Sequence, residues 1–346
     1  FWILMKCSVV ILNWNGEAML RQYLPSVLIY TQLPDVEIVV ADNGSTDGSL
    51  EYLQTQGVRI IVLDQNYGFA EGYNRAIAQV DSEYVVLLNS DVEVTPHWLD
   101  TMLEYMDAHP NVMAAQPKVL SWNSKQEFEA GKREAISFEH AGAAGGMMDI
   151  LGYPYCRGRL MTHLEVDHGQ YDKVQPIFWA TGACLLARTR IYKELGGLDA
   201  KFFAHQEEID LCWRMLNHAS SADNQPILVA IPQAVVYHLG GGTLGYENPR
   251  KTFLNFRNNL LMLYKNLPTT HRWWIMLVRF GMDYLAALQM LLTGQKENVK
   301  AVVRARCAYH KMKKEYTPIH DNKMRGFQLL ARRSIVWDFY VRRKRV

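Results

Sequence analysis

Carboxylate and amide side chains follow four apolar runs near the start of the chain, at the places where buried parallel strands would end. These polar groups are Asn13 with Asn15, the run Asp42–Asp47, Asn66 with Gly68, and the tripeptide Asn89-Ser90-Asp91. Ligands of open α/β sheets bind beyond the carboxyl ends of the strands, so we expect these groups to line one crevice. Ordinary turns use the same residue types, which is the alternative interpretation.

Asp91 is the candidate metal ligand in this set. A carboxylate at the tip of a buried strand, beside an amide, can hold Mg²⁺ or Mn²⁺ against a diphosphate. Asp42 can accept a hydrogen bond from a base imide N–H or a ribose hydroxyl, or it can form a cap or an Asx turn. Asn66-Tyr67-Gly68 precedes a helical run, whose backbone N–H groups favour anions. Its spacing is that of neither a Walker loop nor a Rossmann fingerprint.

Glu207, Glu208 and Asp210 form the densest acidic cluster, at the start of a predicted helix. Adjacent carboxylates raise one another's pKa, so one of them can take a proton from a hydroxyl nucleophile. The structural alternative is that these acids interact with the helix dipole. His238 ends a short predicted strand and precedes three glycines. That position suits a ligand, although a lone histidine more often has a structural role.

Alternating strand and helix patterns must position these residues. Apolar runs predict strands at residues 7–12, 37–41, 59–63 and 84–88. Helical patterns separate them at residues 18–30, 70–80 and 98–108. Strands that are apolar on both faces and alternate with helices are typical of a mostly parallel sheet covered on both sides.

The second half of the chain is less regular. Residues 120–175 are rich in glycine, and we expect an irregular lid or binding segment there. Beyond them the sequence predicts a strand at 178–186 kinked at Gly182, a helix at 206–217, short strands at 227–231 and 234–238, and helices from Arg250 onward.

Taken in order, these segments resemble the family 2 glycosyltransferases of GT-A fold, of the bacterial rhamnosyltransferase-like kind. The matching segments are residues 8–16, 40–49, 66–74, 88–91, 181–185, 196–199, 207–214 and 236–238. The resemblance implies an α/β fold of GT-A type with a mostly parallel central sheet and a C-terminal helical segment. It also implies a nucleotide-sugar-binding half at residues 1–118, an acceptor-binding and catalytic half at 119–248, and a basic, membrane-associating segment at 249–346.

The same resemblance gives expected roles to individual residues. The donor nucleotide is expected to contact Asn13, Asn15, Asp42, Asn66, Gly68, Asn74, Asn89 and Ser90. Asp91, with His238 as a further ligand, is expected to hold Mg²⁺ or Mn²⁺ on the donor diphosphate. Glu208 is the expected general base, with Glu207 as the fallback and Asp210 beside them. The acceptor is expected to contact Trp179, Thr181 and Gly182.

The implied activity is an inverting transfer of a sugar from a dTDP- or UDP-sugar, dTDP-rhamnose among them, to a hydroxyl of a cell-surface glycan or lipid-linked acceptor. A nucleotidyltransferase also uses a metal at a strand end. It would carry a glycine-rich loop with basic residues directly after the first strand, whereas residues 13–17 contain no lysine or arginine. A non-enzymatic protein that binds nucleic acid or another anionic polymer would need a basic body. Residues 1–295 carry 22 Lys+Arg against 31 Asp+Glu, so we expect no nucleic-acid partner.

A formal net charge of +2 conceals a basic C-terminus, because residues 296–346 carry 15 Lys+Arg and 4 Asp+Glu. The preceding apolar run at 273–293 is interrupted by Arg279 and Asp283, whose spacing allows them to pair. Such a helix beside a cationic segment suits the surface of an anionic membrane. We expect a cytoplasmic protein that lies on the inner face of the membrane without crossing it. Five scattered cysteines agree with a reducing compartment.

Overall fold

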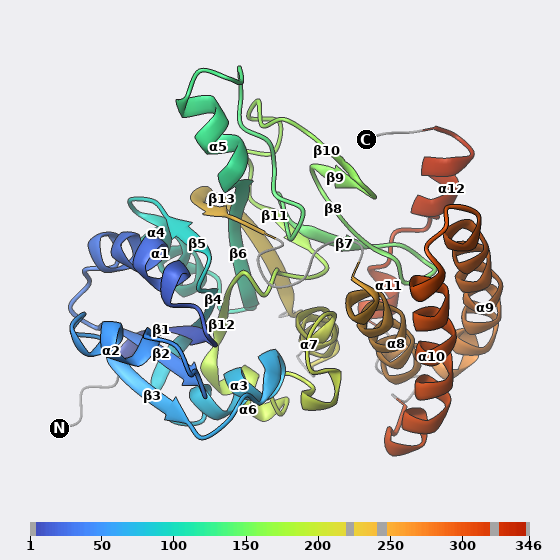
Figure 1. Ribbon diagram of the computed structural model, residues 1–346, viewed down its shortest axis with the longest axis horizontal. Coiled ribbons are helices and arrows are strands. Elements are labelled where there is room, and N and C mark those ends of the chain that lie inside the picture. Colours follow the sequence, from blue (N-terminus) through green and yellow to red (C-terminus); the bar gives the residue numbers. More distant parts are fainter. Residues whose placement is uncertain (1–4, 219–224, 241–247, 319–324, 344–346) are drawn as a thin grey trace.

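A nine-stranded mixed sheet forms the centre of the molecule (Figure 1). The computed structural model describes residues 5–218, 225–240, 248–318 and 325–343. The strand order is β11-β13-β6-β12-β4-β1-β2-β3, and β5 pairs with β13. The strands are β1 (Met5–Asn13), β2 (Val36–Asn43), β3 (Arg59–Leu63), β4 (Ser82–Asn89), β5 (Val92–Val94), β6 (Val112–Ser121), β11 (Gln175–Ile177), β12 (Cys184–Arg188) and β13 (Ile227–His238). The four strands predicted in the first half are all present, and β1 pairs in parallel with both β2 and β4.

Both faces of this sheet are buried, because successive strand residues point to opposite sides. In β4, Val85 and Leu87 belong to one apolar cluster, whereas Val86 and Leu88 belong to the other. One face is covered by α1 (Glu17–Tyr30) and α4 (Trp98–Ala108), and the opposite face by α3 (Gly68–Ile77), α6 (Thr189–Glu194) and α7 (Glu207–Leu216). The short α2 (Ser49–Gln54) follows β2. The prediction of a sheet covered on both sides is therefore confirmed.

Strand β12 runs antiparallel between β4 and β6, which matters for the site. It begins at Cys184, not at residue 178, because residues 178–183 form an irregular approach to the sheet. Cys184 pairs with Leu88, and the backbone N–H of Asn89 donates to the carbonyl of Ala183 at 3.0 Å. The antiparallel direction therefore brings the residues before β12 to the edge where β4 ends.

Two other expectations about the second half were wrong. The strands predicted at 227–231 and 234–238 are one strand, β13, because its pairing with β6 continues past a register shift between Ile231 and Val235. The segment predicted to be irregular contains α5 (Trp122–Glu129) and a second sheet of order β10-β9-β8-β7. Its strands are β7 (Gly146–Met148), β8 (Pro154–Cys156), β9 (Arg159–Leu160) and β10 (His163–Leu164).

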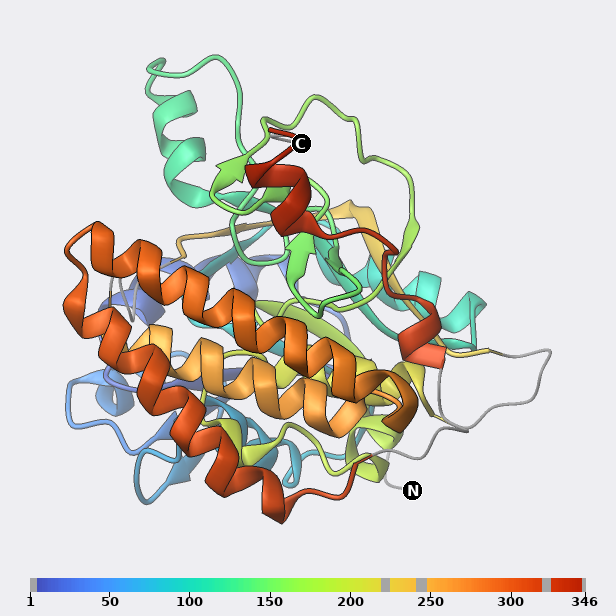
Figure 2. The same cartoon turned by 90° about the vertical axis from the view of Figure 1, so that its right-hand side faces the viewer.

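The C-terminal part is helical, as predicted from Arg250 onward. Helices α8 (Pro249–Asn266), α9 (Thr269–Leu292) and α10 (Lys296–Met312) pack against one another (Figure 2), and α8 lies nearest the central sheet (Figure 1). The inner helix α8 packs against α7 and adds Leu260–Leu263 to the apolar cluster on that face of the sheet. Short helices α11 (Arg325–Gln328) and α12 (Ile335–Tyr340) follow. Ile335 of α12 packs on the second sheet, and its N–H donates to Asp149 at 3.0 Å.

Candidate active site

The ends of β1, β2, β4 and β13 converge on one edge of the central sheet. The register pairs Asn13 with Asp42 across β1 and β2, and Leu12 with Asn89 across β1 and β4. His238, the last residue of β13, pairs with Val92, so it lies beside Asp91. The polar groups that follow β1, β2 and β4 are therefore brought together, and His238 joins them from the opposite half.

The polar groups at the ends of β1 and β2 form a hydrogen-bond network. Asp42 is fully buried, and its two carboxylate oxygens accept from the Asn13 amide at 3.1 Å and from the Ser45 N–H at 2.9 Å. Asn15 accepts from the Thr46 N–H at 2.7 Å and donates its own N–H to the Ser45 hydroxyl. Asp42 therefore forms the Asx-type turn weighed as the alternative. Asn13 Oδ1 is buried without a hydrogen-bond partner, so it is an acceptor that a ligand N–H can use.

Asn66 and Gly68 build the turn that starts α3. Asn66 Oδ1 accepts from the N–H of Gly68 at 2.8 Å and from the side chain of Asn43 at 3.2 Å. Gly68 has φ +78°, and a Cβ there would meet the ring of Phe203 at 2.6 Å. The Asn66 acceptor is thus used within the protein, and Gly68 is required by its backbone conformation and by the close approach of Phe203.

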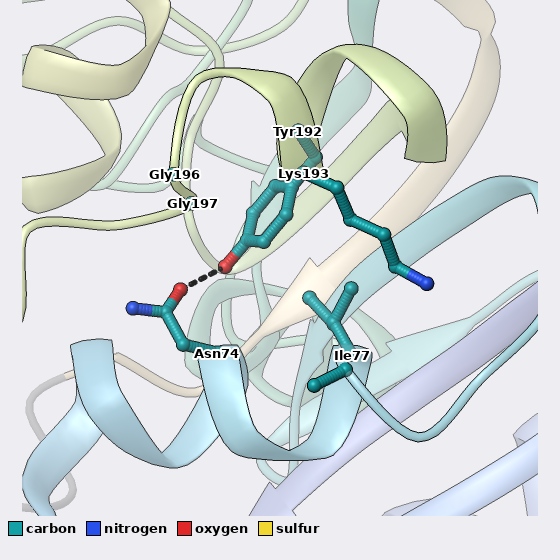
Figure 3. A pocket seen from close by; sticks show the side chains of 7 residues that line it. Asn74, Ile77, Tyr192, Lys193, Gly196 and Gly197 are labelled. Atoms are coloured by element: carbon teal, nitrogen blue, oxygen red, sulfur yellow. Dashed lines mark hydrogen bonds between the residues drawn. The ribbon is translucent and has the colours of Figure 1, made fainter.

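Asn74 lies away from the other predicted donor contacts. Its Oδ1 accepts from the Leu198 N–H at 2.9 Å and from the Tyr192 hydroxyl at 2.7 Å, and its Nδ2 donates to the Leu198 carbonyl. Figure 3 shows Asn74 pointing at Tyr192 in a pocket of about 270 Å³ that none of the other predicted site residues lines. This amide fastens the loop after α6 to α3, and its contact with the donor stays a prediction.

Asp91 and His238 form a charged pair at the end of β4. Asp91 Oδ1 lies 3.2 Å from His238 Nε2, and His238 is only 5% exposed. Burial alone would lower the pKa of His238, but the charges of Asp91 and Glu139 raise it above its usual value. Burial alone would raise the pKa of Asp91, but the pairing with His238 lowers it. Asn89 and Ser90, the predicted donor contacts before Asp91, are partly exposed at the same edge.

This pair fits a divalent cation as two of its ligands. Adjacent ligands of an octahedral Mg²⁺ or Mn²⁺ ion lie about 3 Å apart when the bonds are about 2.1 Å long, which is close to the Asp91–His238 separation. His238 Nδ1 is buried without a hydrogen-bond partner, and Glu139 Oε1 lies 3.9 Å from it. Among the described residues, no group of three or more His, Cys, Asp or Glu side chains is placed to hold a metal. The remaining ligands would have to come from a bound diphosphate and water.

Glu208 lies on the other side of the same edge. Its Cβ is 3.7 Å from the position a Cβ would take on Gly182, in the segment that is hydrogen-bonded to Asn89. Burial raises the pKa of Glu208, and burial together with the charge of Glu208 raises the pKa of Glu207. Oε2 of each glutamate is shielded from solvent without a hydrogen-bond partner. A carboxylate in that condition is suited to accept a proton.

Asp210 does not belong to this group, although it was predicted beside the base. Its side chain is fully buried, and it accepts from Arg214 at 2.8 Å, Lys265 at 2.9 Å and Asn266 at 2.8 Å. Burial alone would raise the pKa of Asp210, but the charges of Arg214 and Lys265 lower it. Asp210 therefore joins α7 to α8 as a permanently charged anchor.

The three residues predicted to contact the acceptor lie in the irregular segment before β12. Trp179 is packed in the core, and its indole N–H donates to the Met147 carbonyl at 2.8 Å. Thr181 is 2% exposed, its hydroxyl accepts from the Ala183 N–H, and its own N–H donates to the side chain of Gln116. Both side chains pack in the approach to β12, and their contact with an acceptor stays a prediction. Gly182 is the member of the predicted set that faces Glu208, and a side chain there would also meet Phe69 at 3.3 Å.

Two features of the site were missing from the sequence analysis. Glu139 is 6% exposed and lies beside His238, although it belongs to the segment predicted to be irregular. The segment before Glu207 has positive φ at Phe203 (67°), His205 (70°) and Gln206 (74°). Such conformations cost on the order of 1–3 kcal/mol each and persist only where surrounding contacts enforce them. Because none of these three residues is glycine, the sequence gives no indication that this loop has a left-handed backbone.

Comparisons with known proteins agree with this architecture. Residues 8–147 match the model of "Glycosyl transferase family 2". The N-acetylglucosaminyl-diphospho-decaprenol L-rhamnosyltransferase of Mycobacterium tuberculosis is 26% identical over 216 residues, which cover 59% of this chain and 68% of that protein.

Solved structures show the same fold. The structure of S. aureus TarS 1–349 in complex with UDP-GlcNAc has a TM-score of 0.55 at 16% identity and covers 87% of this chain and 81% of its own. That of GalNAc-T7 with UDP, GalNAc and Mn²⁺ has a TM-score of 0.56 at 15% identity, with 91% and 57% covered. The resemblance of this chain to the family 2 glycosyltransferases of GT-A fold is therefore confirmed, by sequence over residues 8–147 and by fold over most of its length.

Proposed function

We propose that this glycosyltransferase moves a sugar from a nucleoside diphosphate donor to an acceptor hydroxyl in one inverting displacement. The observation that carries the proposal is the shared edge of the sheet: the Asp91–His238 pair lies at the ends of β4 and β13, and Glu208 lies beside Gly182, in the segment that is hydrogen-bonded to Asn89. A diphosphate bound at the Asp91–His238 pair would place the anomeric carbon of the donor sugar toward Glu208. An acceptor oxygen would then attack from the side of Glu208.

The residues of this chain divide the chemistry between them. Glu208 takes the proton of the attacking hydroxyl, and burial has raised its pKa toward the range where a carboxylate is an effective base at neutral pH. The new bond joins the acceptor oxygen to the anomeric carbon, while the bond from that carbon to the diphosphate oxygen breaks. Asp91 and His238 are the residues that would hold Mg²⁺ or Mn²⁺, which would supply charge neutralisation for the departing diphosphate.

The donor is placed by the network at the ends of β1 and β2. The unpartnered Asn13 Oδ1 can accept the imide N–H of uracil or thymine, and the Asp42 carboxylate fixes the Asn13 amide for that purpose. We therefore favour a UDP- or dTDP-sugar, dTDP-rhamnose among them. The acceptor class follows from the M. tuberculosis relative, whose name describes a rhamnosyl transfer to a diphospho-decaprenol-linked sugar. A lipid-linked or cell-surface glycan is the acceptor that we propose.

Helix α9 supports a location at a membrane surface. By length and composition it could cross a membrane, yet its charged residues face the protein. Arg279 and Asp283 are 3% and 2% exposed, lie 3.4 Å apart as their spacing predicted, and Asp283 also lies 3.5 Å from Arg306 of α10. The opposite face exposes the apolar side chains Trp273, Leu277, Leu285, Leu288 and Leu292. We propose that this apolar face lies in the surface of an anionic membrane, with α9 parallel to it.

Vesicle co-sedimentation tests this location. The protein should sediment with phosphatidylglycerol vesicles, less with phosphatidylcholine vesicles and less at high salt, because basic residues add roughly 1 kcal/mol each near an anionic surface. The double substitution L277E/L288E should abolish binding, since both leucines are more than half exposed on one face of α9. Val62→Glu, at an equally exposed position on β3, is the matched control. Equal sedimentation of the double variant and the wild type would contradict the proposal.

A transfer assay tests the reaction itself. UDP- and dTDP-sugars are offered with Mn²⁺ and a polyprenyl-diphosphate-linked sugar, and the anomeric configuration of the product is read by NMR. The proposal predicts metal-dependent transfer with a configuration opposite to that of the donor. A product that retains the donor configuration would contradict the single displacement.

A further inference from the structure

The strained segment 203–206 is held by the side chain of Asn258, a fully buried residue of α8. Asn258 Nδ2 lies 3.0, 2.9 and 2.8 Å from the carbonyl oxygens of Phe202, Ala204 and His205, and donates to them. The neighbouring Arg257 fixes this amide, because its Nε donates to Asn258 Oδ1 at 2.8 Å. Arg257 Nη2 also donates to the Phe202 carbonyl at 2.9 Å. One side chain therefore collects three carbonyls from four consecutive residues.

These contacts explain how non-glycine residues keep a left-handed backbone there. Phe203, His205 and Gln206 all have positive φ, so their carbonyls turn in directions that a strand or helix would not allow. Buried carbonyls need donors, and the two N–H groups of the Asn258 amide are shared among three of them. Without Asn258, the segment would lose the contacts that enforce its conformation.

The same segment also contacts helix α3, which belongs to the predicted nucleotide-sugar-binding half. The carbonyl of Phe203 accepts the N–H groups of Phe69 and Ala70, at the start of α3, at 2.9 and 3.2 Å. The segment then leads directly into Glu207 and Glu208, and the Gln206 carbonyl accepts the Asp210 N–H as the first bond of α7. Its backbone thus joins the first turn of α3 to the first turn of α7. Its shape fixes where Glu208 stands relative to a donor bound in the crevice.

We propose that Asn258 is a positioning residue that sets the placement of Glu208 through the backbone of residues 202–206. This inference rests on the proposed role of Glu208 as the base. Asn258 is not a catalytic residue, because it contacts neither Glu208 nor the crevice edge and acts only on main-chain carbonyls. The reacting atoms must meet within a few tenths of an ångström, and a misplacement of about 1 Å can lower a rate by about 10²-fold.

The test is Asn258→Ala, with Asn298→Ala as the matched control. Asn298 is a 5% exposed asparagine of α10 whose amide bonds Thr252 and Gln295, so its loss perturbs the same helical layer. The expected result is a fall in kcat of about 10²-fold. The acceptor KM and the dissociation constant for UDP or dTDP with Mn²⁺, measured by calorimetry, should stay within about threefold. Asn298→Ala should lose melting temperature but keep kcat.

Equal kcat values for Asn258→Ala and the wild type would overturn the inference, as would equal losses of kcat in Asn258→Ala and Asn298→Ala. If Asn258→Ala does not fold, Arg257→Met replaces it. That variant removes the donor that fixes the Asn258 amide but keeps the apolar stem, and kcat should fall about tenfold. Unchanged kcat in Arg257→Met would then reject the inference. Glu208→Gln, assayed in parallel, separates the two proposals: full activity there rejects the base, whereas an inactive Glu208→Gln beside a normal Asn258→Ala rejects only the positioning role.

Discussion

The donor end and the base end of the crevice differ in how their buried polar groups are satisfied. At the donor end, Asp42, Asn15 and Asn66 use their oxygens within the protein, and Asn13 Oδ1 alone of that network stays without a partner. At the base end, Glu207 and Glu208 each keep a shielded oxygen without a partner. Unsatisfied buried groups are costly, and two adjacent carboxylates that each keep one mark the place where we expect the proton transfer. Satisfied groups of the same residue types hold the scaffold.

We expect the largest effect from the loss of Asp91, because this carboxylate is the proposed metal ligand beneath the donor diphosphate. Asp91→Ala should lower turnover by about 10³-fold or more, because several kcal/mol of leaving-group stabilisation are removed. Metal-dependent binding of UDP or dTDP should disappear with it. Asp47→Asn is the control, since Asp47 accepts the N–H groups of Glu17 and Ser49 and only caps helices. Unchanged metal-dependent nucleotide binding in Asp91→Ala would exclude Asp91 as a ligand.

A second variant concerns Asp210, whose carboxylate is fully hydrogen-bonded, in contrast to Glu208 on the same helix, which keeps an oxygen without a partner. Asp210→Asn should lower the free energy of unfolding by about 3 kcal/mol, because Arg214 and Lys265 lose a buried partner. Its kcat, measured on folded protein, should stay within about tenfold of the wild type. Urea unfolding and steady-state kinetics give the two numbers. A stable but inactive Asp210→Asn would return Asp210 to the catalytic group.

The smaller effect is the pH dependence that the raised pKa of Glu208 implies. The base must be ionised, so kcat/KM should rise with pH until Glu208 is deprotonated and then level off. The midpoint should lie well above the usual glutamate pKa of about 4.3. Stability should change in the opposite sense. Between the unfolded and the folded pKa the native state binds more protons than the unfolded state, so the free energy of unfolding falls as pH rises.

If kcat/KM is already independent of pH at pH 5, the pKa of Glu208 is not raised as we describe. A free energy of unfolding that does not change between pH 5 and 7 would show the same for the buried pair. Measuring both in Glu208→Gln identifies the residue, because this variant should lose the rising limb and part of the stability change.

The sequence was a good guide wherever a residue's place depends on its own strand. Asn13, Asp42 and Asp91 follow apolar runs, so their meeting at one edge could be predicted from the rule for parallel sheets. It was a poor guide where a partner lies far along the chain. Glu208 and Asp210 are two residues apart, and two of the three side chains that bond Asp210, Lys265 and Asn266, lie more than 50 positions later. Asn74 and Trp179 likewise bond residues that are far away in the sequence, Leu198 and Met147.

The central claim is that Glu208 is the base facing the donor held at Asp91 and His238, and two single substitutions test it most directly. Glu208→Gln and Glu207→Gln are compared for kcat, for UDP or dTDP binding with Mn²⁺, and for unfolding. The account predicts that Glu208→Gln lowers kcat by about 10²–10⁴-fold while nucleotide binding and folding are kept. Glu207→Gln should change kcat far less. A large loss in Glu207→Gln beside a nearly normal Glu208→Gln would contradict the assignment and move the base by one position.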